Sequence, residues 1–448
     1  MNNYSIYPKQ FQYEKILTKK NTCFMIMPFD DSFNAIYGVI KEEAEKNGIL
    51  CSRADEMNGS QPVVNKIITG ILESQYIIVD ITHAKPNVFY ELGIAHSFRD
   101  AQSILLIKQQ GDEYPFDISH LPYQNYSAKN VYQLKSIIND FIKSSKCITD
   151  FRDALAINDI YDNTITGSMN YIEYIEDYFG ENICIYSYIL NTSASKYEKP
   201  EIDNAFANFE NFLKNTILEH NLSMMDGVIR VYIKLIEKCD LDDVSRKYTK
   251  RFSDTLLVAG IEDRTMIITK ETDLMLALAE SNKLLDQCLP WIIGYFSKSK
   301  SSNIDLNRYK LESFLMNSSS KEVESAIINS MYHEDCHIRE HMADIIGAKG
   351  IINAYKTLKS QLFVEENWFT IGSIIEAIGK IAPKKEGLQI IDKWIDINGT
   401  MLIEQKQFFL LKHIFHALSL LEIDSNEYTD KFITNYGKYF HQNQVGPL

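Results

Sequence analysis

The N-terminal third of the chain alternates short apolar runs with amphipathic helical patterns four times in succession. The apolar runs are TCFMIMPF (22–29), ILCSRADE (49–56), YIIVDIT (76–82) and SILLIKQ (103–109). Their apolar residues are continuous rather than alternating, which is typical of strands covered on both faces. The pattern therefore predicts a doubly wound α/β domain with a mainly parallel sheet over residues 21–147, after a polar lead-in at 1–20.

Beyond residue 147 the sequence shows almost only helical periodicity, which predicts an all-α region. Residues 148–319 read as helical without an assignable repeat. From residue 320 to 448 the helical patterns come in pairs, about 30 to 45 residues per pair, which is the range of helical solenoids. The segment HEDCHIREHMADIIGAKG (333–350) resembles a HEAT repeat, in which an aspartate and an arginine bond between neighbouring units. We therefore expect HEAT-like repeats over 320–448.

Composition and charge exclude several classes of protein. The formal net charge is −14, so long-range electrostatics oppose nonspecific binding to nucleic acid or to anionic membranes. No run of 18 apolar residues predicts a membrane span, and the polar N-terminus has no apolar signal core. The seven cysteines are dispersed, without zinc spacing, which predicts free thiols in a reducing cytoplasm. His333, His337 and His341 share a helical spacing, which we interpret as an exposed ridge and not as a metal site.

Two carboxylates lie at the edge of the most apolar region. Asp80 ends the third apolar run, and Glu91 follows within KPNVFYELGIAHS (85–97). The dipole of a helix stabilises an anion near its start, whereas apolar neighbours raise the pKa of a carboxyl group. Such a carboxylate can stabilise a cationic sugar carbon, as in glycoside hydrolysis. The alternative is structural: Asp80 would cap a turn, and Glu91 would lie on the exposed side of an amphipathic helix.

Further candidate residues lie where the predicted strands end. Ligands of doubly wound sheets bind at the carboxyl ends of the strands. Pro28, Phe29 and Asp30 lie at the end of the first apolar run, and Asp55 lies near the end of the second. Asn87 precedes Glu91 by four residues and could donate to either carboxylate. We take these five residues as candidate substrate-binding residues.

Three of these segments carry a family resemblance. MPFD (27–30), VDIT (79–82) and PNVFYELGIAHS (86–97) resemble the nucleoside 2-deoxyribosyltransferase-like and TIR-like superfamily over about residues 22–125. The resemblance implies that Glu91 is the catalytic carboxylate for a C1′–N glycosidic bond, and that Asp80 binds the ribose or assists. The segment before Glu91, AKPNVFYE, contains a proline and no glycine. This departs from deoxyribosyltransferases and favours the NAD-cleaving, TIR-like branch.

The resemblance implies a hydrolase that converts NAD⁺ to nicotinamide and ADP-ribose, with NAD as substrate and no resident cofactor or metal. It also implies a homo-oligomer of the kind found among bacterial antiviral effectors, with a protein or small-molecule trigger bound by the helical region. Two alternatives stay open. One is a nucleoside or nucleotide N-glycosidase or deoxyribosyltransferase. The other is a non-catalytic nucleotide-binding module on a helical interaction scaffold.

Overall fold

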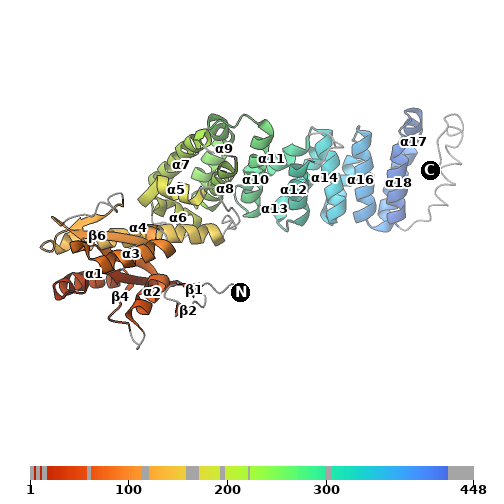
Figure 1. Ribbon diagram of the computed structural model, residues 1–448. Helices are drawn as coiled ribbons and strands as arrows, with labels where there is room; N and C mark the ends of the chain where they lie inside the picture. The colour runs from red at the N-terminus through yellow and green to blue at the C-terminus, as the bar shows by residue number, and fades with distance from the viewer. Residues whose placement is uncertain are drawn as a thin grey trace. The chain divides into compact units, whose positions relative to one another are not determined.

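The computed structural model describes residues 5–6, 11–12, 18–57, 62–99, 101–112, 121–157, 171–191, 197–219, 222–297 and 305–421. The chain forms two compact units, residues 1–193 and residues 194–448. The first contains every strand of the described chain, and the second is helical (Figure 1). This arrangement confirms the expected order of an α/β domain followed by an all-α region.

A five-stranded sheet forms the centre of the first unit. Its strands are β3 (Lys19–Ile26), β4 (Leu50–Arg53), β5 (Ser74–Asp80), β6 (Ile104–Gln109) and β7 (Gln124–Tyr126). The spatial order is β4-β3-β5-β6-β7, and every neighbouring pair is parallel. A short antiparallel pair, β1 (Ser5–Ile6) and β2 (Phe11–Gln12), precedes the sheet.

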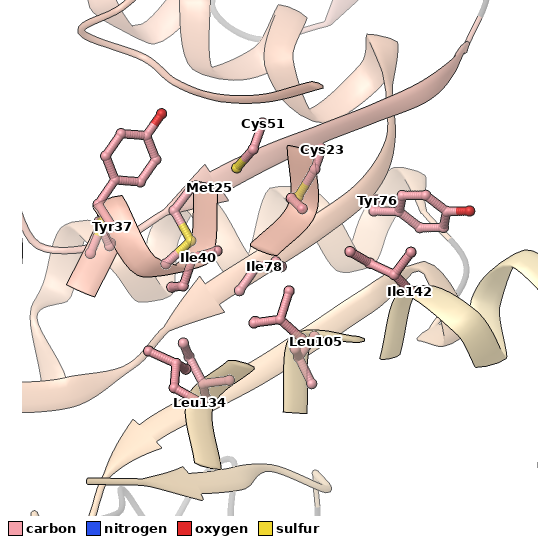
Figure 2. Packing of buried hydrophobic residues seen from close by; sticks show 14 of the residues in the cluster. Cys23, Met25, Tyr37, Ile40, Cys51, Tyr76, Ile78, Leu105, Leu134 and Ile142 are labelled. Carbon is pink, nitrogen blue, oxygen red and sulfur yellow. The ribbon is translucent and has the colours of Figure 1, made fainter. Parts of the chain in front are cut away.

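Helices cover both faces of this sheet, as continuously apolar strands require. They are α1 (Asn34–Lys46), α2 (Val63–Glu73), α3 (Pro86–Phe98) and α4 (Val131–Ile157). Alternate residues of β3 pack on opposite sides: Cys23 and Met25 join the core with α1 and α4, whereas Phe24 joins the core with α2 and α3. Figure 2 shows the first of these cores, with Cys23 and Met25 among the side chains of α1, β5 and α4.

The strand order shows where the direction of the chain connections reverses. From β3 the chain passes through α1 to β4 on one side of it, and from β4 it passes through α2 to β5 on the other side of β3. Such a reversal separates the loops at the carboxyl ends of the two central strands and opens a crevice there. In this chain the corresponding position lies between the carboxyl ends of β3 and β5, and we call it the switch point.

The first unit extends past the boundary expected at residue 147. Helix α4 runs unbroken to Ile157, and α5 (Tyr171–Phe179) and α6 (Ile183–Asn191) belong to the same unit. The Arg152 guanidinium pairs with the buried carboxylate of Glu176 on α5 at 2.6 Å. A disulfide joins Cys147 of α4 to Cys184 of α6. The expectation of seven free thiols is therefore wrong, because helix packing brings together two cysteines that are 37 residues apart.

The second unit consists of α7 (Lys199–Glu219), α8 (Leu222–Lys238), α9 (Asp242–Val258), α10 (Arg264–Glu280), α11 (Leu285–Gly294), α12 (Leu306–Asn317), α13 (Lys321–Asn329), α14 (Cys336–Lys349), α15 (Tyr355–Gln361), α16 (Trp368–Ile381), α17 (Lys384–Glu404) and α18 (Phe409–Leu420). None of the helices in the described ranges combines the length and the apolarity needed to span a bilayer.

Polar contacts show that the repeat begins well before residue 320. Lys247 of α9 pairs with Asp203 of α7 at 2.8 Å, and Ser281 after α10 bonds Glu237 of α8 at 2.6 Å. In both contacts the partners are 44 residues apart. Equivalent positions of successive helix pairs therefore stack on one another. The region expected to lack an assignable repeat thus contains one, starting at α7.

The HEAT-like segment differs in detail from its sequence expectation. Asp335 accepts a hydrogen bond from the His337 N–H and so caps α14. Arg339 pairs with the buried Glu365 through two bonds of 2.6 and 2.8 Å, instead of with an aspartate. His341 is buried against the Phe296 ring. The expected exposed ridge of three histidines is therefore wrong at its third position.

Candidate active site

Glu91 is a buried carboxylate on the second turn of α3. The helix begins at Pro86, whose fixed φ and missing N–H suit the first helical position. The side chain of Glu91 shares a face with Val88 and Ala95, and the residue is only 9% exposed. Among the described residues it has no hydrogen-bond or ion-pair partner. The alternative of an exposed helix position is therefore wrong, because α3 turns this side toward the apolar core.

Burial alone raises the pKa of the Glu91 carboxyl group from 4.5 to about 7. Neither a neighbouring charge nor a hydrogen bond offsets the loss of water around the anion. Near neutral pH the group is therefore divided between its neutral and its anionic form. Groups poised in this way near the working pH are typical of catalytic acids and bases.

The raised pKa of Glu91 predicts how the free energy of unfolding depends on pH. Between pH 4.5 and about 7 the folded state keeps a proton that the unfolded state has lost, so stability falls as pH rises through this window. From pH 5 to pH 8 the loss should be about 2 to 3 kcal/mol. We expect Glu91→Gln to abolish this part of the slope, as measured by urea unfolding of both proteins at the two pH values. If the free energies of unfolding of variant and parent differed by the same amount at pH 5 and at pH 8, the raised pKa of Glu91 would be refuted.

Asp80 ends β5 and is completely buried. One carboxylate oxygen accepts hydrogen bonds from the Thr82 N–H at 3.0 Å and from the Thr82 hydroxyl at 2.5 Å. The other accepts from the Tyr126 hydroxyl at 2.7 Å. The Thr82 oxygen in turn accepts from the Gln109 N–H at 2.9 Å. This network ties β5, β6 and β7 together at their carboxyl ends.

Burial raises the pKa of Asp80, and the hydrogen bonds from Thr82 and Tyr126 work against that rise. The described contacts give Asp80 a structural role at the turn after β5; ribose binding remains a prediction. Sequence analysis missed Tyr126, because the short strand that carries it (QNY) has no apolar run to signal it.

We expect removal of this network to destabilise the fold. Asp80→Ala leaves the buried hydroxyls of Thr82 and Tyr126 without their acceptor and should lower the free energy of unfolding by about 3 kcal/mol. Asp55→Ala is the matched control, because it removes a half-exposed carboxylate and should cost at most about 1 kcal/mol. Urea unfolding measures both. Equal stability of the two variants would show that the network contributes nothing.

The structure does not pair Asp80 with Glu91. Asp80 lies on the same face of β5 as Tyr76 and Ile78, and these two residues belong to the core with α1 and α4. Glu91 belongs to α3, whose buried residues pack in the opposite core. The two carboxylates therefore belong to different layers of the domain, and Asp80 is not a partner of Glu91.

The loop after β3 forms one side of the switch point. Asp30 accepts hydrogen bonds from the Ser32 N–H at 2.9 Å and from the Ser32 hydroxyl at 2.6 Å. These bonds lower the pKa of Asp30, and the charges of Lys85 and His83 add to the effect. Pro28 is buried, whereas the Phe29 ring is 57% exposed. Phe29 is thus an exposed apolar side chain of this loop, and its role in substrate binding stays a prediction.

The loop after β5 forms the other side. His83 and Ala84 both have left-handed backbone, with φ of 65° and 47°. A non-glycine residue with left-handed backbone destabilises the fold by about 1 to 3 kcal/mol, and such strained residues are frequent at functional sites. The His83 N–H donates to the Asp112 carboxylate, and its ring stands edge-on to Phe33 at 5.7 Å. These contacts hold the strained loop in place.

Asp55 and Asn87 lie at different positions near the carboxyl ends of the strands. Asp55 pairs with Arg53 through bonds of 2.8 and 2.7 Å, and this pairing lowers the pKa of Asp55. The Arg53 guanidinium lies 4.6 Å from the Tyr37 ring and 5.8 Å from the Phe29 ring. Asp55 therefore positions Arg53, which sequence analysis had not selected. Asn87 is exposed on the first turn of α3.

The structure thus brings the loops after β3 and β5 into contact through Phe33 and His83, and it connects Asp55 to Phe29 through Arg53. Asp80 lies within the sheet, and Glu91 lies on α3. No protein-family model, curated protein or solved structure matches the chain. The family resemblance therefore depends on its motif residues alone.

Proposed function

We propose that the first unit cleaves an N-ribosyl bond, with NAD⁺ as the first candidate substrate and Glu91 as the catalytic carboxylate. The observation that carries this proposal is a buried, unpartnered Glu91 with a pKa of about 7, on the helix that follows a central strand of a doubly wound sheet. Burial without a partner destabilises the anion, and a cationic sugar carbon would relieve that cost.

The chemistry follows from the charge of the leaving group. In NAD⁺ the bond from C1′ to the nicotinamide nitrogen breaks, and its electron pair goes to that nitrogen. Nicotinamide leaves neutral, so no acid is needed. The anionic form of Glu91 stabilises the cationic C1′ until the oxygen of water bonds to it and a proton is released to solvent. ADP-ribose is the second product.

The alternatives differ in how they use Glu91. An uncharged nucleoside or deoxynucleotide loses its base as an anion unless the base is protonated, so the protonated form of Glu91 would be the active one. A non-catalytic nucleotide-binding module would use Glu91 only as a contact. In all three cases we propose that the helical unit at 194–448 supplies control by assembly or by a bound trigger, as in bacterial defence.

The test is to incubate the full-length chain separately with NAD⁺, nucleosides and deoxynucleotides and to measure free base from pH 5.5 to 8.5. Free nicotinamide at a rate that rises with pH through about 7 supports the proposal. Free purine or pyrimidine at a rate that falls above that pH supports the nucleoside alternative. Binding of substrate without free base, with or without added cell extract as a source of trigger, supports the non-catalytic module.

A further inference from the structure

We infer that the helical unit binds a ligand with a primary ammonium group, either a polyamine or a lysine side chain, in a groove between the ends of α10 and α12. At the junctions on either side, between α8 and α10 and between α12 and α14, a lysine of the chain itself fills the equivalent place. The inference concerns the second unit alone and does not depend on the proposed N-ribosyl cleavage.

A lysine closes the end of α8 at its junction with α10. Lys283 follows α10, and its Nζ donates to the backbone carbonyls of Ile236 at 3.3 Å, Glu237 at 3.1 Å and Cys239. The last carbonyls of a helix have no partner within it and carry a partial negative charge. An ammonium group at this place therefore satisfies both the hydrogen bonds and the charge of the helix end.

The junction of α12 and α14 is closed in the same way. Lys349 is the last residue of α14, and its Nζ donates to the carbonyls of Leu315 at 2.7 Å and Ser318 at 2.5 Å at the end of α12. Burial lowers the pKa of both Lys283 and Lys349, because each ammonium group loses water at its site. Two successive helix ends of this solenoid are thus built to take an ammonium group out of water.

The junction of α10 and α12 lies between these two and has no such lysine. Asn317 is the last residue of α12, the position that Lys349 has in α14, and three serines follow at 318–320. The lysine of α12, Lys310, pairs instead with Asp273 on α10 at 2.8 Å. Among the described residues no lysine donates to the carbonyls at the end of α10.

A groove of about 950 Å³ lies at this junction. Its walls include Ala279 in the last turn of α10, Asn282 after that helix, Asn317 at the end of α12 and the serines at 318–320. Ligand sites in proteins have volumes of about 300 to 1,000 Å³. The exposed ring of Tyr309 also lines the groove, and an aromatic face attracts cations. The groove is therefore large enough for a ligand at the place where the neighbouring junctions hold a lysine.

The charges around the groove favour a cation. Three carboxylates and one lysine line it: Asp273, Glu280, Glu322 and Lys310. Lys310 neutralises Asp273, and Glu322 accepts a hydrogen bond from the Ser320 hydroxyl at 2.7 Å. Glu280 is exposed and makes no ion pair or hydrogen bond among the described contacts. Glu280 is therefore the carboxylate available to an incoming ammonium group.

The test measures binding of two probes to the full-length protein by titration calorimetry: spermidine, and an acetylated Gly-Lys-Gly amide that represents a lysine side chain of a protein. Asn317→Lys should weaken binding of the better probe about tenfold or more, because the tethered ammonium group competes at an effective concentration of about millimolar or higher. Glu280→Gln should weaken it about twofold to fivefold, as expected for an exposed charge pair. The matched control is Ser325→Lys on α13, an exposed position outside the groove that receives the same added charge. It should leave binding unchanged.

The two probes identify the source of the ammonium group. Tighter binding of spermidine assigns the groove to a free polyamine, and tighter binding of the peptide assigns it to a lysine side chain of a partner protein. No binding of either probe at millimolar concentration would overturn the inference, and so would binding that Asn317→Lys leaves unchanged. Circular dichroism and urea unfolding check the variants. Asn317→Lys should be at least as stable as Ser325→Lys, because its new side chain can cap α10 as Lys283 caps α8; a lower urea midpoint would show that the groove does not suit an ammonium group.

Discussion

Glu91→Gln should reduce base release by about 10²- to 10³-fold while leaving the fold intact. The amide keeps the size of the side chain but cannot carry the negative charge that stabilises a cationic sugar carbon. Because Glu91 makes no described ion pair or hydrogen bond, the substitution breaks no contact of the folded protein. The measurement is the initial rate of base release at pH 8, where the parent carboxyl group is mostly ionised, given its pKa of about 7.

The matched control is Glu45→Gln, an exposed glutamate on the last turn of α1. It should retain the parent rate, and circular dichroism should give the same spectrum for all three proteins. If Glu91→Gln kept more than half of the parent activity, Glu91 would not be the catalytic carboxylate. A variant that was inactive and also unfolded would instead assign Glu91 a structural role.

The strands of the first unit could be predicted because a short, continuous apolar run indicates a strand that is buried on both faces. The run at 22–29 corresponds to β3, shifted to Lys19–Ile26. The shift has two physical causes. Lys19 pairs with Ser74 of β5 although it is polar and exposed, and Pro28 has no N–H with which to extend the ladder. Polar residues at one end of a strand and a proline at the other thus shift its ends, while the strand keeps its place in the sheet.

The strand order and the site contacts could not be predicted in the same way. The pattern places Asp80 at a strand end, but its partner Tyr126 lies 46 residues later on a short polar strand. The sequence leaves an exposed position of Glu91 open, and only the packing of α3 shows that the residue is buried. Local pattern identifies which side chains are unusual, whereas long-range contacts decide what surrounds them.

The helical unit shows the same limit. Periodicity predicts each helix from its own residues, but a solenoid repeat is defined by contacts between successive pairs. The contacts that reveal the repeat, such as Asp203 with Lys247, join positions 44 residues apart in otherwise dissimilar segments. Sequence similarity between repeats is weak because each pair needs only an apolar face and one or two polar contacts to its neighbour.

A fragment of residues 1–193 should unfold cooperatively, whereas a fragment cut at 147 should be less stable by about 4 to 6 kcal/mol. The cut removes the last part of α4, which is fixed to the sheet region by two contacts. Arg152 donates to the Gln102 side chain at 2.9 Å, and Asp153 pairs with Lys20 at 2.6 Å. It also removes the disulfide partner Cys184. A disulfide alone contributes about 2 to 4 kcal/mol, and the polar contacts about 1 kcal/mol each.

Urea unfolding of both fragments, with and without reductant, separates these contributions. Reduction should lower the stability of 1–193 by the disulfide part alone and leave it above that of 1–147. The shorter fragment should not respond to reductant, because Cys147 has no partner there. If the reduced 1–193 fragment unfolded at the same urea concentration as 1–147, the packing of α5 and α6 on α4 would add nothing beyond the disulfide. The first unit would then end at residue 147 as the sequence pattern predicts, and α5 and α6 would only be attached to it.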